Sequence, residues 1–142
     1  MAEARVFRGR VRAGRGAATV IMSDPAVLAT YGRLAGLSII PGTLNIRLLQ
    51  PFDLWRLRYV NLEEHGFKPD FARWGINYTG EMGMHTGRVL VEGRYPAGLI
   101  FFTWAPDPGL DAELVSPHHL RRRLGLQDGD TVEFTLVDTA GG

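Results

Sequence analysis

Thr43 and Asn45 are the two side chains of this sequence whose types and spacing could bind a metal ion. They lie in the run Pro41-Gly42-Thr43-Leu44-Asn45, where proline and glycine predict a tight turn and the alternation that follows predicts a strand. Residues two apart in a strand point to the same face, so the hydroxyl and the amide oxygen would lie side by side. Mg²⁺ takes such hard oxygen ligands, often few from the protein together with substrate phosphates. The alternative is a polar turn whose side chains bond only to their own backbone, and the pentapeptide alone favours that alternative.

A second candidate site is the glycine pair Gly14 and Gly16, with Arg12 and Arg15 around it. Glycines spaced by one residue allow the backbone to approach a ligand closely and to present N–H groups to an anion, and the arginines would add positive charge. The same pattern also occurs in ordinary turns, so its specificity is low. No Gly-Lys-Ser or Gly-Lys-Thr run occurs in the chain, which excludes a Walker-type phosphate loop.

Two adjacent histidines, His118 and His119, follow a helix start. Ser116 and Pro117 predict a helix that runs to Leu124, and the free N–H groups of its first turn could bind an anion. Neighbouring side chains on a helix point about 100° apart, so the two rings are poorly placed to share one metal ion. We expect the histidines at the surface rather than at a shared metal ion.

Composition and charge limit the classes of protein to which the chain can belong. Its 142 residues predict a single domain spanning 1–142, with residues 139–142 as a flexible tail. The absence of cysteine excludes a disulfide framework, a thiolate zinc site and a cysteine nucleophile. The 16 basic residues against 15 acidic ones argue against nucleic acid as a partner, although arginines cluster at 5–15 and 121–123. No signal peptide or membrane-spanning run is visible, so we expect a soluble, cytoplasmic protein without a membrane partner.

The elements that must position these residues are mostly short strands. Strands are predicted at residues 5–12, 43–49, 88–94, 97–103, 113–115 and 132–136. A helix is predicted from Pro25 to Gly36, after a capping residue at 23 or 24, and the glycine-rich segment Gly80–Gly87 predicts a loop. Many short strands with two short helices predict a mainly β protein, a small β-barrel with helical insertions.

The order of these signals along the chain resembles that of the archaeal-type CTP-dependent riboflavin kinases. The shared order comprises a basic strand, a GxG loop, a capped helix, the run PGTLN, a glutamate before S-P-x-x-L-R, and a final L-x-D-G-D-x-V strand. The resemblance covers residues 6–136, and PGTLN and residues 113–130 are its most specific parts. It implies a six-stranded cradle-loop β-barrel that transfers the γ-phosphoryl group of CTP to the riboflavin 5′-hydroxyl, giving FMN and CDP with Mg²⁺.

The resemblance also implies roles for individual residues. Thr43 and Asn45 match the residues that hold Mg²⁺ in the family, which makes Asn45 a catalytic candidate as well. Glu113 matches a flavin-side carboxylate, and it could orient the acceptor hydroxyl or accept its proton. Thr103 stands in place of a further flavin-contacting segment. The residues that match nucleotide-binding positions are Gly14, Arg15, Gly16, Ala17, Ala18, Thr19, His118, His119, Leu120 and Arg121.

Two departures from the family pattern leave alternatives open. The family's loop usually continues as G-x-G-E-G, whereas Ala17 and Ala18 follow Gly16 here, and the loss of a glycine restricts the backbone of a phosphate loop. The family's Thr-x-His segment has no clean counterpart, because Thr103 lies two residues further from Glu113 than that pattern expects. The alternatives are a CTP-dependent kinase of another small hydroxyl compound, and a non-catalytic barrel that binds a nucleotide, a flavin or DNA.

Overall fold

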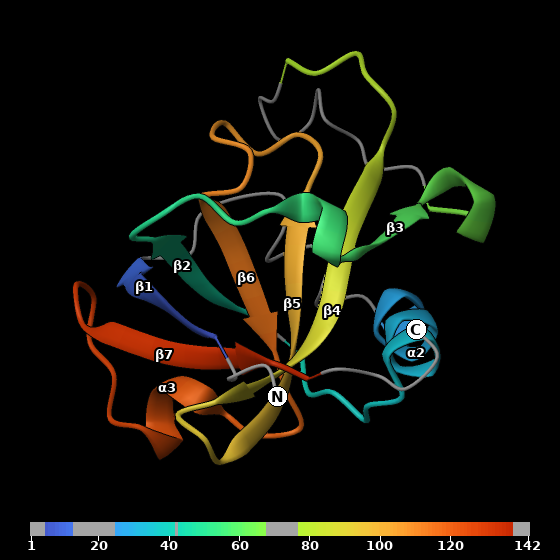
Figure 1. Cartoon of the computed structure of the whole chain (residues 1–142). Coiled ribbons are helices and arrows are strands. Elements are labelled where there is room, and N and C mark those ends of the chain that lie inside the picture. The colour runs from blue at the N-terminus through green and yellow to red at the C-terminus, as the bar shows by residue number, and fades with distance from the viewer. Residues whose placement is uncertain (1–4, 13–24, 42, 68–76, 138–142) are drawn as a thin grey trace.

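The sheet of this protein closes on itself as an antiparallel barrel (Figure 1). The computed structural model describes residues 5–12, 25–41, 43–67 and 77–137. Within these ranges the hydrogen-bonded strand order is β3-β4-β5-β6-β2-β1-β7, and β4 also pairs with β7. The second pairing closes a ring of six strands and leaves β3 outside it. The mainly β fold with a six-stranded barrel that the sequence analysis predicts is thereby confirmed.

The strands and helices are short and follow one another closely. The strands are β1 (Val6–Arg12), β2 (Leu44–Leu48), β3 (Arg58–Asn61), β4 (Gly83–Val91), β5 (Tyr95–Phe102), β6 (Asp111–Val115) and β7 (Thr131–Leu136). The helices are α2 (Pro25–Ala35), α3 (Leu120–Arg123) and the 3₁₀ turns η1 (Leu54–Arg56) and η2 (Glu63–His65). None of the helices in the described ranges has the length and apolar character needed to cross a bilayer.

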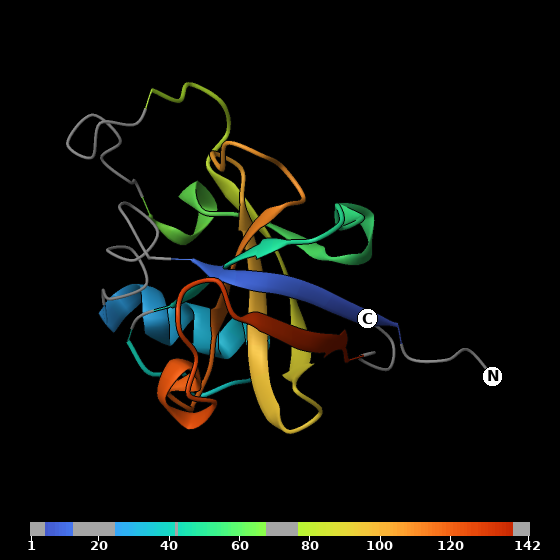
Figure 2. The same ribbon diagram turned by 90° about the vertical axis from the view of Figure 1, so that its left-hand side faces the viewer.

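Alternating burial along the strands builds the core of the barrel. In β7, for example, Val132 and Phe134 are buried while Thr131 is exposed, as expected for a strand with one face in the core. β5 is buried on both faces, because Leu99 and Phe101 point into the barrel while alternate residues meet α2. Figure 2 shows β1 and β7 running across β5 at a steep angle, the strand crossing that barrel closure requires.

Helix α2 packs outside the barrel against β4 and β5, whereas α3 lies next to β7 on another side (Figure 1). The buried hydroxyl of Tyr31 on α2 donates to Thr86 of β4 at 2.5 Å, and Thr86 donates to the carbonyl of Leu99 at 2.8 Å. Gly98 of β5 leaves the room for this tyrosine ring, since a Cβ there would lie 2.9 Å from ring carbons. The predicted start of α2 at Pro25 is confirmed, and Gly36, with a φ of 68°, ends the helix.

Two sequence predictions about local structure are wrong. The helix expected from Ser116 to Leu124 begins only at Leu120, because His119 provides the cap. The loop expected at residues 80–87 ends at Gly83, where β4 begins. A Cβ at position 83 would meet the ring of Tyr59, so a larger residue there would displace this exposed side chain.

Candidate functional site

Thr43 and Asn45 are placed on the outer side of the barrel wall by the burial of the residues between and beyond them. Leu44, Ile46 and Leu48 are 5%, 1% and 4% exposed, so β2 turns its apolar face into the core. The intervening side chains point outward and are half-buried. The predicted division of this segment into a core face and a polar face is confirmed for the strand.

Asn45 is the centre of a row of outward-facing residues on three neighbouring strands. It lies opposite Arg12 of β1 on one side and opposite Glu113 of β6 on the other. The hydroxyl of Thr43 donates a hydrogen bond of 2.7 Å to Oε1 of Glu113, a residue 70 positions away in the sequence. Thr43, Asn45 and Glu113 therefore form one cluster of oxygen-bearing side chains, here called the oxygen cluster.

Glu113 is a buried carboxyl group with only 6% of its surface exposed. Burial raises its pKa from 4.5 to about 7, because desolvation opposes the charged form more strongly than the hydrogen bond from Thr43 favours it. A carboxyl group with a pKa near 7 is present in both protonation states at neutral pH. It can therefore accept a proton from a neighbouring hydroxyl group and release it again, which is the property of a general base.

The oxygen cluster fits a magnesium ion by the chemistry of its donors. Hydroxyl, carboxamide and carboxylate oxygens are hard ligands, and few of them suffice where substrate phosphates complete the coordination. In the part of the chain that the structure describes, no three His, Cys, Asp or Glu side chains gather in a way that could hold a metal ion. Thr43 and Asn45 would contribute neutral oxygen ligands to such a site.

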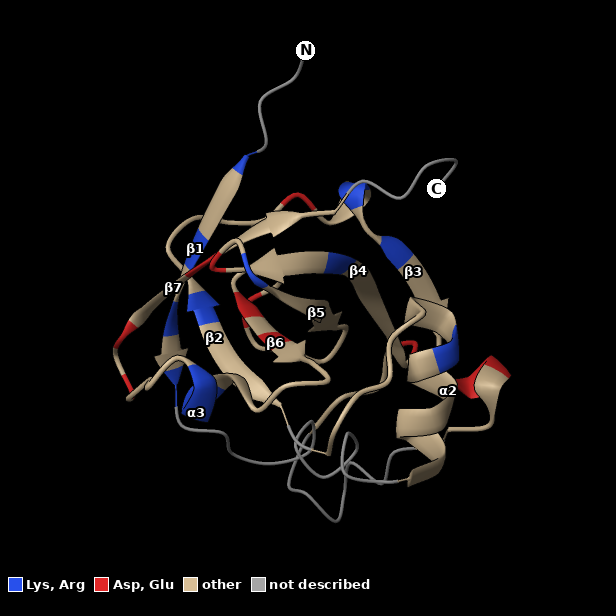
Figure 3. Cartoon of the chain, turned by 90° about the horizontal axis from the view of Figure 1, so that it is seen from below, with Lys and Arg blue, Asp and Glu red and all other residues tan. Residues whose placement is uncertain are grey.

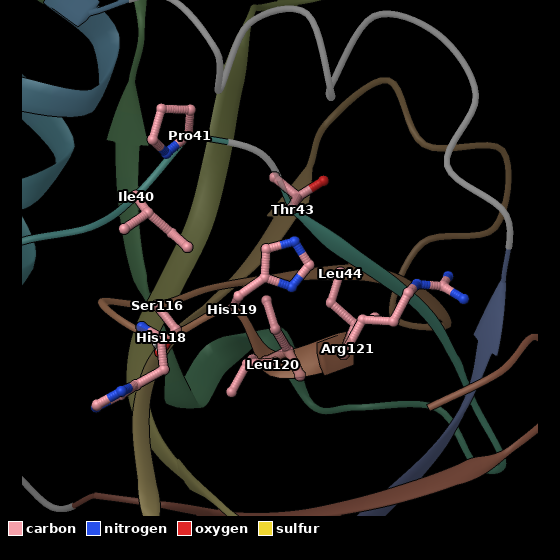
Figure 4. A pocket seen from close by; sticks show the side chains of 10 residues that line it. Ile40, Pro41, Thr43, Leu44, Ser116, His118, His119, Leu120 and Arg121 are labelled. Atoms are coloured by element: carbon pink, nitrogen blue, oxygen red, sulfur yellow. Dashed lines mark hydrogen bonds between the residues drawn. The ribbon is translucent and has the colours of Figure 1, made fainter. Parts of the chain in front are cut away.

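A cavity of about 320 Å³ lies beside Thr43 (Figure 4). One group of lining residues precedes or begins β2, and the other lies in and after β6: Ile40, Pro41, Thr43 and Leu44 in the first, and Leu114, Ser116, His118, His119, Leu120 and Arg121 in the second. The lining combines aliphatic side chains with a few polar groups, a composition typical of small-molecule sites. The cavity and the oxygen cluster share Thr43, so a ligand in the cavity would be adjacent to the cluster.

Ser116 ties these two groups of lining residues together. Its carbonyl oxygen accepts a hydrogen bond of 3.0 Å from the backbone N–H of Ile40. Its hydroxyl donates to the carbonyl of Pro96 at 2.7 Å and accepts from the N–H of His118 at 3.1 Å. The serine that the sequence analysis assigned to a helix cap therefore closes a turn at the base of the cavity instead.

The two adjacent histidines have different surroundings. Nδ1 of His119 accepts a hydrogen bond of 3.4 Å from the N–H of Arg122, so the neutral ring carries its proton on Nε2. Figure 4 shows this ring below Thr43 in the cavity, whereas the side chain of His118 is directed away from it. The His118 ring packs against Tyr95, with 5.2 Å between the ring centres. His119 is therefore the histidine that offers a hydrogen-bond donor to a ligand.

Next to the oxygen cluster, on the same outer face of the barrel, lie ion pairs that the sequence analysis did not predict. Arg12 binds Asp111 at 2.7 Å, and Arg47 binds Asp107 at 2.7 Å and Asp111 at 3.1 Å. Figure 3 shows the basic positions on β1 and β2 and the acidic positions on β6 that contribute to this face. No local spacing in the sequence links these residues, because strand register brings Arg12, Arg47 and Asp111 together and the loop before β6 adds Asp107.

The other predicted site residues differ in where they lie. His118, His119, Leu120 and Arg121 all line the cavity, although Leu120 is largely buried beneath it. The predicted phosphate loop, Gly14–Thr19, lies outside the described residues.

Thr103 lies apart from the oxygen cluster. Its hydroxyl donates to the carbonyl of Glu81 at 2.8 Å and accepts from the N–H of Gly83 at 3.1 Å. Glu113 pairs with Ile100 of β5, and Thr103 lies three residues further along the chain. Three residues of extended chain span roughly 10 Å, which separates Thr103 from Glu113. A role for Thr103 in substrate binding stays a prediction.

Comparison with known proteins identifies similar chains. A family model labelled CTP-dependent riboflavin kinase, and described as "Domain of unknown function DUF120", matches residues 11–136. A riboflavin kinase of Methanospirillum hungatei is 32% identical over 140 residues, covering 92% of this chain and 58% of that protein. A riboflavin kinase of Methanocella arvoryzae is also 32% identical, covering 94% of this chain and 58% of the relative. A riboflavin kinase of Sulfurisphaera tokodaii is 25% identical, covering 92% and 93%. The chain thus spans a little over half the length of the first two relatives.

Proposed function

Because the chain belongs to the family of CTP-dependent riboflavin kinases, we propose that it transfers the γ-phosphoryl group of CTP to the 5′-hydroxyl of riboflavin, giving FMN and CDP. The observation that carries this proposal is the oxygen cluster, in which a buried carboxyl group with a pKa near 7 is bound to Thr43 beside a cavity. Phosphoryl transfer depends on positioning and charge neutralisation more than on covalent chemistry, and such a site can supply both.

Glu113 is the proposed general base. In the proposed step the riboflavin 5′-oxygen forms a bond to the γ-phosphorus while the bond from that phosphorus to the β,γ-bridging oxygen breaks. The bridging oxygen leaves with the electron pair as part of CDP, and the hydroxyl proton passes to the Glu113 carboxylate and then to solvent. The raised pKa of Glu113 makes the carboxylate basic enough to accept this proton near pH 7.

Thr43 and Asn45 are the proposed protein ligands of Mg²⁺. An ion bound there would neutralise negative charge on the phosphate oxygens of the nucleotide. The Thr43 hydroxyl can serve two partners, because its proton is directed at Glu113 and its oxygen lone pairs remain available. The same residue would thus connect the base to the phosphate side of the site.

The cavity beside the cluster is the proposed position of the cytidine part of CTP. The Nε2 donor of His119 would meet an acceptor atom of the nucleotide, and Arg121 at the rim would contribute positive charge. Arg121 is already held by Asp128 at 3.0 Å, which orients its guanidinium group. Ile40 and Pro41 provide apolar surface for the base or the ribose.

A kinase that phosphorylates another small hydroxyl compound is the second candidate function. It is favoured by the position of Thr103, whose hydroxyl is already bound by Glu81 and Gly83. The donor side of the reaction and the roles of Thr43, Asn45 and Glu113 would be the same for either acceptor.

The test combines calorimetric titration of CTP, ATP and riboflavin, each with Mg²⁺, and detection of FMN by its chromatographic retention and fluorescence. Binding of CTP and riboflavin with FMN formation is expected, and the double variant Thr43→Ala/Asn45→Ala should lose turnover while keeping its circular dichroism spectrum. Thr131→Ala, which changes an exposed threonine of β7, is the matched control and should retain activity. CTP binding without riboflavin binding would favour the second candidate, and unchanged turnover in the double variant would remove the metal assignment.

A further inference from the structure

Arg12, the last described residue of β1, extends its side chain across β2. Its Nη1 binds Oδ1 of Asp111 on β6 at 2.7 Å, although β2 lies between these two strands. In the strand register Arg12 is opposite Asn45, and Asn45 is opposite Glu113. Asp111 precedes Glu113 by two residues on the same face of β6, a separation of roughly 7 Å. A change in the side-chain rotamer of Arg12 would therefore bring its guanidinium group to the oxygen cluster.

The contact between Arg12 and Asp111 is easily broken. The Arg12 side chain is 53% exposed and that of Asp111 is 18% exposed, so solvent screens the pair and its contribution to stability is small. A phosphate group that carries more than one negative charge offers a guanidinium group stronger hydrogen bonds than a screened carboxylate does. A polyphosphate at the oxygen cluster would therefore compete with Asp111 for Arg12.

Asp111 has a second cationic partner that remains when Arg12 leaves. Nη1 of Arg47 binds the same carboxylate at 3.1 Å and binds Asp107 at 2.7 Å. Departure of Arg12 therefore leaves Asp111 paired, and the cost of separating the ions stays low. The backbone of Arg12 is held independently, since its carbonyl oxygen accepts a hydrogen bond of 3.5 Å from Arg121 at the cavity rim.

From these contacts we infer that Arg12 exchanges partners: it is held by Asp111 in the nucleotide-free protein and binds a β- or γ-phosphate oxygen when CTP is bound. The inference rests on the proposed function. Asp111 is then a positioning residue that keeps the guanidinium group beside Asn45 and competes with the nucleotide for it. The exchange neutralises phosphate charge next to the base Glu113.

The experiment is a double-mutant cycle on nucleotide affinity, measured by calorimetry with CTP and with CMP in the presence of Mg²⁺. Asp111→Asn should tighten CTP binding two- to five-fold, which is about 0.4–1 kcal/mol, because the competing partner is lost. Arg12→Gln should weaken CTP binding at least tenfold, and adding Asp111→Asn to it should change affinity less than two-fold. With CMP, which lacks the β- and γ-phosphates, the two substitutions should show no coupling.

Asp107→Asn is the matched control, because it removes the same charge from the same group of ion pairs without touching Arg12. It should change CTP affinity less than two-fold. Three results would each overturn the partner exchange. The first is weaker CTP binding in Asp111→Asn, and the second is that Asp111→Asn raises CTP affinity as much in the Arg12→Gln background as in the wild type. The third is that Asp107→Asn raises CTP affinity as much as Asp111→Asn does. If the wild-type protein makes FMN and the cycle shows no coupling, only this inference fails; if it binds no CTP, the proposed function fails with it.

Discussion

Replacing Glu113 by glutamine should stabilise the protein at neutral and alkaline pH while removing the proposed activity. Glutamine retains a side-chain oxygen that can accept the hydrogen bond from Thr43, but it has no carboxyl group to ionise. A comparison of wild type and variant at the same pH therefore isolates the cost of carrying a charge at this buried position.

The magnitude follows from the pKa of Glu113, which burial raises from 4.5 to about 7. Below pH 4.5 the carboxyl group is protonated in both the folded and the unfolded chain, so it contributes no difference. Between pH 4.5 and 7 the folded protein holds a proton on Glu113 that the unfolded chain has lost, so the contribution of Glu113 to wild-type stability falls steadily as the pH rises. Above pH 7 the loss levels off at about 3 kcal/mol, or about 6–12 °C in Tm for a domain near this size.

The assay is urea unfolding followed by tryptophan fluorescence for both proteins at several pH values from 4.5 to 8. The free energies of unfolding should nearly coincide at pH 4.5 and diverge to about 3 kcal/mol at pH 8, with the variant more stable. Glu133→Gln, which changes an exposed glutamate bound to Arg8, is the control and should show no such divergence. A difference that does not depend on pH, or a less stable Glu113→Gln protein at pH 8, would refute the assignment of a buried, ionisable base.

Three further predictions concern the reaction, the cavity and the packing of α2. The kcat of the wild-type enzyme should rise with pH through about 7 and then level off, because Glu113 must be deprotonated to accept the hydroxyl proton; a flat profile in a chemistry-limited assay would contradict this role. His119→Ala should weaken CTP binding at least five-fold more than His118→Ala in calorimetric titrations, because the His119 ring is the one that faces the cavity. Gly98→Ala should destabilise the fold by about 1–3 kcal/mol in urea unfolding, since the added Cβ meets the Tyr31 ring, and the loss should shrink in a Tyr31→Leu background.

The polar face of β2 could be predicted from sequence because its determinants are local. The alternation of Leu44 and Ile46 with polar residues determines which side chains of β2 point outward. The apolar periodicity of residues 25–35 likewise predicted α2, and Pro25 predicted its first residue. In these segments residues close in the sequence determine both the secondary structure and the face on which each side chain lies.

Features that depend on contacts between distant segments could not be predicted in the same way. The hydrogen bond from Thr43 to Glu113 and the ion pair of Arg12 with Asp111 arise from strand register, which no short-range pattern encodes. Gly83 suggested a loop, yet it begins strand β4, where the ring of Tyr59 lies next to it. The role of Glu113 in particular came from its resemblance to a family, and its raised pKa becomes visible only when its burial is known.

The pairing of β1 with β7 also determines how this barrel can form during protein synthesis. Arg8 and Glu133, which face each other in that pairing, are 125 residues apart in the chain. At about 5–20 residues per second, a ribosome needs about 6–25 s to produce the segment that separates them. Throughout this interval β1 has an unpaired edge, and the ring can close only when β7 reaches both β1 and β4. Until the chain has been made as far as residue 136, the edge of β1 that pairs with β7 therefore stays open to other strands.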